Sequence, residues 1–218
     1  MRKFIVLFLL TVCVACSAGC KKDLYAGNIS ELRQDIYAGN AQNATITAYY
    51  GFRETPFKSD GVVSDKIYGF TFKLDVIPDE IKRSVEFSDE NKTYRADFAL
   101  DDITSEYKAF IEVNKHFDKG FTVDLICGAN AEKVTLLSIV PNNSIDHLAA
   151  LRALSEKQRA LFDAYTVDGK FQAEIYMRIF VKDDRPYWYI AITPAENKLK
   201  AMLIDGSTGE LLAIKDIF

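Results

Sequence analysis

The sequence predicts an α+β fold that is mainly antiparallel β, and three observations support this class. Short runs rich in β-branched and aromatic residues recur along 44–140, with turn residues between them. One long helical pattern follows at Ser144–Tyr165, and strand-like runs joined by tight turns end the chain. We therefore expect a β-sandwich-like domain over 44–140 and, over 141–218, a helix packed on a three- to four-stranded antiparallel sheet.

The first nineteen residues have the layout of a secretory signal peptide. Arg2 and Lys3 give a positive start, and an apolar run, Phe4–Cys16, follows them. Small residues then precede Cys20, which completes the three-part pattern of charge, apolar core and cleavage site. The apolar run is shorter than the roughly 20 residues that a spanning helix needs. We expect residues 1–19 to be removed from the mature protein.

The residues around the predicted cleavage site resemble the bacterial lipobox, whose cysteine is acylated and becomes the first mature residue. Ala18, Gly19 and Cys20 match this pattern, whereas Ser17 stands where the family usually has an aliphatic residue. The resemblance implies lipidation at Cys20 and an extracytoplasmic protein anchored to the cell membrane. Stable membrane anchoring takes more than one acyl chain. The resemblance implies a cysteine that carries a diacylglycerol and an amide-linked acyl group, which is enough for a stable anchor. An ordinary cleaved signal and an uncleaved anchor are the alternatives.

The net charge of the predicted mature chain bears on the class of partner that it can bind. Removing residues 1–19 leaves 25 basic and 31 acidic side chains, a net charge of −6. An acidic chain without a Lys/Arg cluster argues against nucleic acid as a partner.

Of the four cysteines, Cys127 alone remains after signal removal and lipidation, so the sequence predicts no disulfide framework. We expect Cys127 to be a small apolar residue within a strand.

Residues 20–43 are predicted to form a tether and a short helix. Ser30 can cap a helix over Glu31–Tyr37, whose apolar residues share one face. Gly39 and its neighbour then end this helix. The segment would link the membrane to the first folded domain.

Alternating apolar and polar residues predict seven strands in the next segment. They are Ala44–Arg53, Lys66–Ile77, Arg83–Ser88, Thr93–Leu100, Tyr107–Val113, Phe121–Cys127 and Lys133–Val140. Clusters of Gly, Pro, Asp and Asn separate the strands, which is the punctuation of an antiparallel sandwich.

Pro141-Asn142-Asn143 is the predicted boundary to a second, separately folding unit. The helical pattern Ser144–Tyr165 should break near Ser155, which has capping-box spacing to Gln158. The final strands are predicted at Phe171–Lys182, Pro186–Thr193, Lys198–Asp205 and Glu210–Ile214. If the two units fold independently, a protease should cut near Asn142-Asn143 before it cuts elsewhere.

The last part of the chain resembles a PepSY-like domain. The aromatic strand Pro186–Ile190 is followed by an apolar strand that ends in Asp205-Gly206-Ser207-Thr208-Gly209-Glu210, as in the closing hairpin of that family. The resemblance covers 141–218 at most, and the whole chain also resembles lipoproteins of Gram-positive bacteria. The PepSY-like resemblance implies that the protein is an inhibitory or regulatory partner of an extracytoplasmic peptidase. The family has no catalytic residue, so none is carried over.

The sequence shows no catalytic set, metal site or cofactor motif. His116 and His147 stand apart, without a Cys or a second His at metal-ligand spacing. No G-x-S-x-G elbow occurs. Consecutive residues on a strand point to opposite faces, and the carboxylate pairs Asp101-Asp102 and Asp183-Asp184 lie at predicted turns, where we expect them to be solvated. We therefore predict a protein that is not an enzyme and that takes no metal and no cofactor.

The aromatic strand is the one segment with a predicted binding role. Alternation places Tyr187 and Tyr189 on the face opposite Trp188, which we expect to be core. Tyr187 and Tyr189 are then candidates for binding a partner. The sequence predicts a membrane-anchored binding or regulatory lipoprotein that acts on an envelope protein or peptidase. The alternatives are an envelope hydrolase with an unrecognised carboxylate site and a purely structural adaptor.

Overall fold

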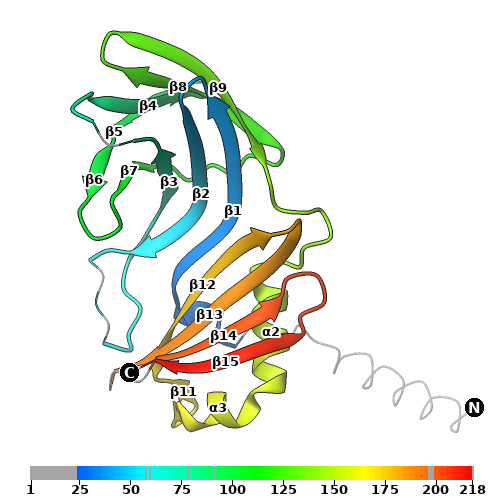
Figure 1. The fold of residues 1–218 in the computed structure, drawn as a ribbon. Coiled ribbons are helices and arrows are strands. Elements are labelled where there is room, and N and C mark those ends of the chain that lie inside the picture. The colour runs from blue at the N-terminus through cyan, green and yellow to red at the C-terminus, as the bar shows by residue number, and fades with distance from the viewer. Residues whose placement is uncertain are drawn as a thin grey trace, which may run out of the picture.

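One large sheet runs through the described part of the chain (Figure 1). The computed structural model describes residues 24–217 apart from 57, 59, 78, 91 and 196–198. Thirteen of the described strands join in this sheet, and their pairing is nearly all antiparallel. The predicted signal peptide over 1–19 and the predicted lipid on Cys20 lie outside the described residues.

The elements alternate short turns with strands over most of the chain. The N-terminal elements are the 3-10 helix η1 (Ala26–Asn28) and the strands β1 (Ile29–Ala41), β2 (Ala44–Glu54), β3 (Lys66–Asp75), β4 (Arg83–Ser88), β5 (Thr93–Asp97), β6 (Ala99–Asp101), β7 (Glu106–Glu112), β8 (Gly120–Cys127) and β9 (Asn130–Ser138). The C-terminal elements are α2 (His147–Lys157), α3 (Arg159–Ala164), β10 (Thr166–Val167), β11 (Lys170–Phe171), β12 (Ala173–Lys182), β13 (Arg185–Pro194), β14 (Leu199–Asp205) and β15 (Leu211–Ile217).

The predicted α+β class, with a helix on a small separate sheet, is wrong, because the chain is nearly all antiparallel β. Helices in the described residues are limited to η1, α2 and α3. The predicted sandwich and the predicted C-terminal sheet are parts of one sheet with the order β15-β14-β13-β12-β1-β2-β3-β7-β6. The physical reason is β1, which pairs with β2 along one edge and with both β12 and β9 along the other.

Strands β1 to β9 curl into a nearly closed, barrel-like wall (Figure 1). From β6, neighbouring strands are β7, β3, β2, β1, β9, β8, β4 and β5. The interior is apolar and rich in aromatic rings, and Phe70 and Phe72 have no exposed surface. The Phe70 ring contacts Tyr37, Phe87 and Phe121. Edge-on and tilted ring contacts around Phe70 therefore connect the aromatic residues of this first core.

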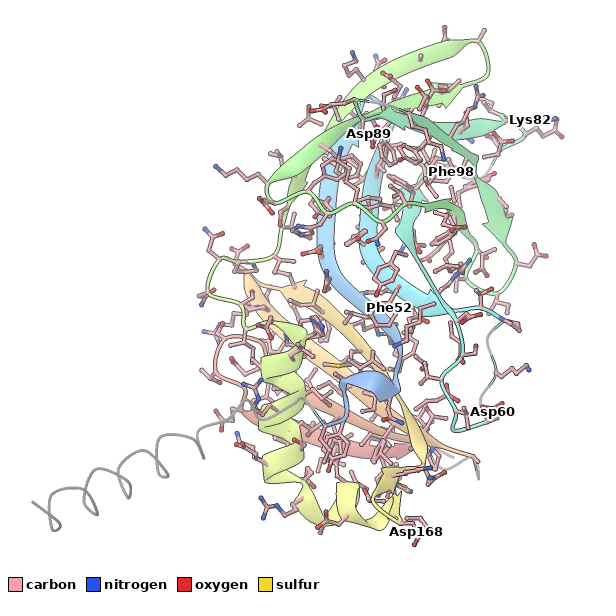
Figure 2. The ribbon with its side chains drawn as sticks, turned by 180° about the vertical axis from the view of Figure 1, so that it is seen from behind. Phe52, Asp60, Lys82, Asp89, Phe98 and Asp168 are labelled. Atoms are coloured by element: carbon pink, nitrogen blue, oxygen red, sulfur yellow. The ribbon has the colours of Figure 1, made fainter. Side chains whose placement is uncertain are left out.

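A second core lies between α2 and the strands β12 to β14, and Figure 2 shows α2 lying across this part of the sheet. Asp146 caps α2, because its carboxylate accepts the N–H of Ala149 at 2.7 Å. Leu154 of the helix, Trp188 of β13 and Leu32 of β1 are all buried in this core. The helix thus covers the C-terminal strands, while β1 supplies part of the apolar surface beneath it.

Strand β1 stands where the sequence predicts a tether and a helix. The predicted helix over Glu31–Tyr37 is wrong, since the segment is extended and paired. A bulge between Arg33 and Asp35 shifts its register against β2. Bulges break the two-residue alternation of a strand. Leu32 therefore packs in the second core and Tyr37 in the first, with the apolar spacing that predicted a helix.

The predicted helical stretch forms two short helices that meet at Gln158. The φ and ψ of Gln158, −113° and 36°, leave the helical region, so the break predicted near Ser155 lies three residues further on. Within the described residues, no helix is both long enough and apolar enough to cross a membrane.

The connection from β2 to β3 is tied to β12 by a buried carboxylate. Glu174 is 2% exposed and accepts the N–H groups of Asp60 and Gly61 at 3.0 and 2.9 Å. Glu54, at the end of β2, accepts the N–H of Ser64 from the same connection. Figure 2 shows Asp60 at the tip of this connection, beside the ends of the C-terminal strands. Burial raises the pKa of Glu174, and the two donated hydrogen bonds partly offset that effect.

Candidate ligand-binding groove

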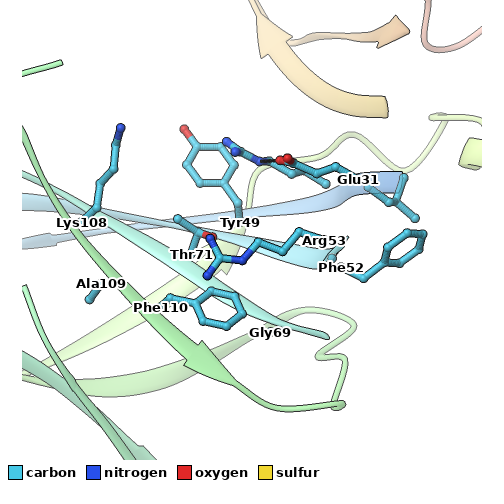
Figure 3. Close-up of a pocket in the computed structure, with 12 residues that line it drawn as sticks. Glu31, Tyr49, Phe52, Arg53, Gly69, Thr71, Lys108, Ala109 and Phe110 are labelled. Carbon is cyan, nitrogen blue, oxygen red and sulfur yellow. Dashed lines mark hydrogen bonds and ion pairs between the residues drawn. The ribbon is translucent and has the colours of Figure 1, made fainter. Parts of the chain in front are cut away.

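A groove crosses the face of the sheet where the barrel-like wall meets the C-terminal strands. Two neighbouring cavities of about 280 and 290 Å³ form it, and both are lined by Arg33 and Tyr49. Figure 3 shows the first of them, with side chains from β1, β2, β3 and β7. The groove is defined by Glu31, Arg33, Tyr49, Arg53, Phe110, Arg178 and Tyr189.

Two glycines leave the floor of the groove without side chains. Gly51 of β2 and Gly69 of β3 are directly paired across the sheet. A Cβ on Gly51 would lie 1.7 Å from the carbonyl oxygen of Leu32, and one on Gly69 would lie 2.3 Å from that of Ile111. Only glycine therefore allows the strands to approach this closely. The ring of Phe110 lies over Gly69, whose backbone is buried.

Aromatic rings hold the arginine side chains of the groove. The guanidinium carbon of Arg53 lies 4.2 Å from the ring centroid of Phe110. Figure 3 shows these two side chains next to one another. Arg178 lies 4.7 Å from the ring of Tyr189 and 5.8 Å from that of Tyr176. Stacking on a ring fixes the plane of a guanidinium and leaves its N–H groups free to donate.

Glu31 is the acidic residue of the groove, and it is already engaged twice. Its Oε1 accepts from Arg33 Nε at 2.7 Å and from the Tyr176 hydroxyl at 2.7 Å. Burial, followed by the charge of Glu31, raises the pKa of Tyr176 to about 12. Tyr176 therefore remains a hydrogen-bond donor at neutral pH. The network fixes β1 to β12 at the centre of the groove.

The charge of the groove is unbalanced. Arg33 and Arg178 are direct neighbours on the paired strands β1 and β12, an arrangement that brings two positive charges together. Among the described residues, no carboxylate lies within 4.0 Å of the guanidinium of Arg53 or Arg178. Among the described residues that line the groove, Glu31 is thus the one carboxylate beside three guanidiniums, in a chain whose net charge is −4.

The structure places the two sequence-predicted tyrosines on this side of β13. Trp188 is 1% exposed in the second core, which confirms the predicted alternation of this strand. Tyr189 lines the groove, whereas Tyr187 stacks on Phe180 with ring centroids 5.3 Å apart. Both tyrosines are half-buried, and their role in binding stays a prediction.

Sequence reasoning missed the arginines of the groove. Arg33 falls in the segment mispredicted as a helix, and Arg53 lies near the end of β2, far from Arg178 in the chain. One signal was available: Tyr49, Gly51 and Arg53 alternate along one strand, which puts an aromatic ring and a guanidinium on the same face. Their partner strands could not be read from that alternation.

A second polar cavity, of about 290 Å³, lies between β1, the β7–β8 connection and the start of α2. His116 Nε2 lies 3.3 Å from Asp35 Oδ2, and its Nδ1 lies 3.2 Å from Asp118 Oδ1. His147 lines the same cavity, so the structure brings together two histidines that the sequence predicts to be unrelated. No group of three or more His, Cys, Asp or Glu in the described residues is arranged to hold a metal ion.

Asp35 is the carboxylate of this cavity whose ionised form is destabilised by burial. Burial raises the pKa of its carboxyl and outweighs the attraction of His116. The native state then binds the Asp35 proton more tightly than the unfolded chain does, so ionising Asp35 at neutral pH costs folding free energy. Asp35→Asn should therefore raise the melting temperature at pH 7. The gain should shrink as the pH falls through the raised pKa toward the ordinary value of 3.8.

Thermal unfolding of wild type and variant at pH 7 and pH 4 measures this effect. Asp118→Asn is the matched control, because Asp118 also contacts His116 but its side chain is 90% exposed. If the melting temperature of Asp35→Asn at pH 7 is lower than that of wild type, ionised Asp35 does not cost folding free energy and the prediction is wrong.

No family model, curated protein or solved structure matches this chain. The groove and the polar cavity must therefore be interpreted from their own residues. Of the two, the groove combines hollow shape, aromatic surface and unpaired charge, which are the properties of a binding surface.

Proposed function

We propose that this chain is a lipoprotein held outside the cytoplasmic membrane by lipid on Cys20, and that it binds an envelope protein through the groove without catalysing a reaction. The observation that carries the proposal is the groove, in which two cavities meet at Arg33 and Tyr49. The signal-peptide layout and the Ala18-Gly19-Cys20 match support the location. The PepSY-like ending makes an extracytoplasmic peptidase the first class of partner to look for.

The composition of the groove supports binding to a protein. Energetically dominant residues of protein interfaces are enriched in Trp, Tyr and Arg, and each costs about 2 kcal/mol or more when truncated. The groove presents Tyr49 and Tyr189 beside three arginines. The buried carboxylates Glu54 and Glu174 accept backbone N–H groups, so their charges serve the fold.

Capture from native membranes tests this proposal. The tagged, full-length chain should retain an envelope protein that the double variant Tyr49→Ser with Tyr189→Ser loses, because both rings contribute to the groove. Leu212→Ser with Ile214→Ser is the matched control, since these exposed side chains lie on β15, outside the groove. A folded groove variant that recovers the same proteins as wild type would refute the binding face.

The same membrane fractions test the anchor. Cys20→Ala should leave the membrane fraction or remain unprocessed, because its acylated side chain is lost. Mass spectrometry of the mature N-terminus identifies the lipid directly. A variant that is processed and membrane-bound like wild type would show that Cys20 is not the anchor.

A further inference from the structure

We infer that the groove binds an extended acidic peptide segment of a protein partner, with carboxylates of the segment paired to Arg53 and Arg178. This inference rests on the proposed function and adds the chemistry of the ligand. It starts from three guanidiniums on the neighbouring strands β2, β1 and β12 and from the single carboxylate of Glu31 among them.

The charge imbalance is the first argument. Like charges that face one another across paired strands are destabilising, and Arg33 and Arg178 are such a pair. Glu31 pairs with Arg33 at 2.7 Å and is the cross-strand neighbour of Arg53, but among the described residues no carboxylate lies within 4.0 Å of the guanidinium of Arg53 or Arg178. Local conflicts of this kind are expected at functional sites. An acidic ligand would supply the missing negative charge.

The orientation of the guanidiniums is the second argument. The guanidinium carbon of Arg53 lies over the Phe110 ring, 4.2 Å from its centroid, and that of Arg178 lies over the Tyr189 ring at 4.7 Å. A stacked guanidinium keeps its planar edge free for two parallel hydrogen bonds to one carboxylate. Because the rings already restrict these side chains, less conformational entropy is lost on binding.

The surface between the arginines favours a peptide over a chain of phosphates. The rings of Tyr49, Phe110 and Tyr189 offer apolar contact that side chains can use and phosphates cannot. Each cavity, at about 280 and 290 Å³, is just below the size of small-molecule pockets and suits side chains. The groove crosses six neighbouring strands from β7 to β13. Five inter-strand steps span about 24 Å, the length of about seven extended residues.

Peptide binding to the full-length chain in detergent tests the inference. The probe is a fluorescent nine-residue peptide of alternating Glu and Leu, and the comparison peptides carry Gln or Lys in place of Glu. We expect anisotropy to show binding of the Glu peptide that weakens with salt, at least tenfold weaker binding of the Gln peptide and no binding of the Lys peptide. Equal binding of the Glu and Gln peptides would overturn the inference.

The arginines are tested by Arg53→Gln with Arg178→Gln, both at exposed positions where the fold should tolerate the change. This variant should bind the Glu peptide at least tenfold more weakly. The control Lys133→Gln with Arg159→Gln removes two exposed charges outside the groove and should bind like wild type. If the melting temperature of the double arginine variant falls well below that of wild type, the two single variants are compared with wild type instead. The salt dependence of peptide binding to wild type then tests the role of the arginine charges independently.

Two further outcomes separate this inference from the proposed function. Inorganic polyphosphate that displaces the Glu peptide and binds more tightly would overturn the peptide assignment. If Tyr49→Ser with Tyr189→Ser loses the captured envelope protein while the arginine variant keeps it, the binding face stands and the acidic ligand is wrong. If both variants keep the captured protein, the proposed function itself fails.

Discussion

Replacing Trp188 with alanine should lower the free energy of unfolding by about 3–5 kcal/mol. The side chain is 1% exposed and packs in the second core between β13 and α2. Its Nε1–H also donates to the carbonyl oxygen of Ile145 at 3.0 Å, so the truncation removes a ring and a hydrogen bond. The lost bond leaves a carbonyl at the start of the helical segment without its partner. Denaturant titration followed by circular dichroism measures the change.

Ile214→Ala provides the matched control for Trp188→Ala. Ile214 is 47% exposed on β15, the last strand of the sheet, and its truncation should change stability by about 0.5 kcal/mol. A loss below about 1 kcal/mol for Trp188→Ala would contradict the assignment of Trp188 to a packed core.

Local hairpins were predictable because their signals lie within a few residues. The strand Arg83–Ser88 has the predicted bounds, and its neighbours are separated by the predicted turns. Asp183 and Asp184 join β12 to β13 with φ values of 51° and 57°, the left-handed conformation that two-residue hairpin turns require. Asp205 likewise accepts the N–H groups of Ser207 and Thr208 at its turn.

The continuity of the sheet was not predictable from these signals. It depends on β1, whose parallel pairing with β12 joins segments about 145 residues apart. The close approach of the strands depends on Gly51 meeting Gly69, and neither residue indicates its partner in the sequence. Alternation identifies the faces of a strand but not the neighbour on either edge. The predicted sandwich and separate sheet follow when each hairpin is treated alone.

The groove shows the same division between local and distant information. Tyr189 was a candidate from alternation within one strand, and it lines the groove. Arg33, Arg53 and Arg178 were not, because they meet only when β1 pairs with both β2 and β12. Because Glu31–Tyr37 was predicted to be a helix, Glu31 was not recognised as the carboxylate that accepts hydrogen bonds in the groove.

Residues 144–218, expressed alone, should fail to fold cooperatively. The sequence predicts a separate unit from Ser144, but the second core includes Ile29, Leu32 and Ile36 of β1, all at most 3% exposed. Without β1, that apolar surface and the edge of β12 would be exposed to water. Tyr25 would also be lost, and its ring packs 4.6 Å from that of Phe162. We expect the chain to unfold as one cooperative unit.

Two probes of the intact chain test this coupling. Trp188 is the single tryptophan, so its fluorescence reports the second core, while far-ultraviolet circular dichroism reports the strands of both halves. The two denaturation curves should coincide, as expected for a two-state transition. The fragment 24–218 is the control, and fusing residues 24–41 to 144–218 should restore part of the transition. Separate transitions, or a fragment 144–218 that melts cooperatively by itself, would show that the halves fold independently despite the shared strand.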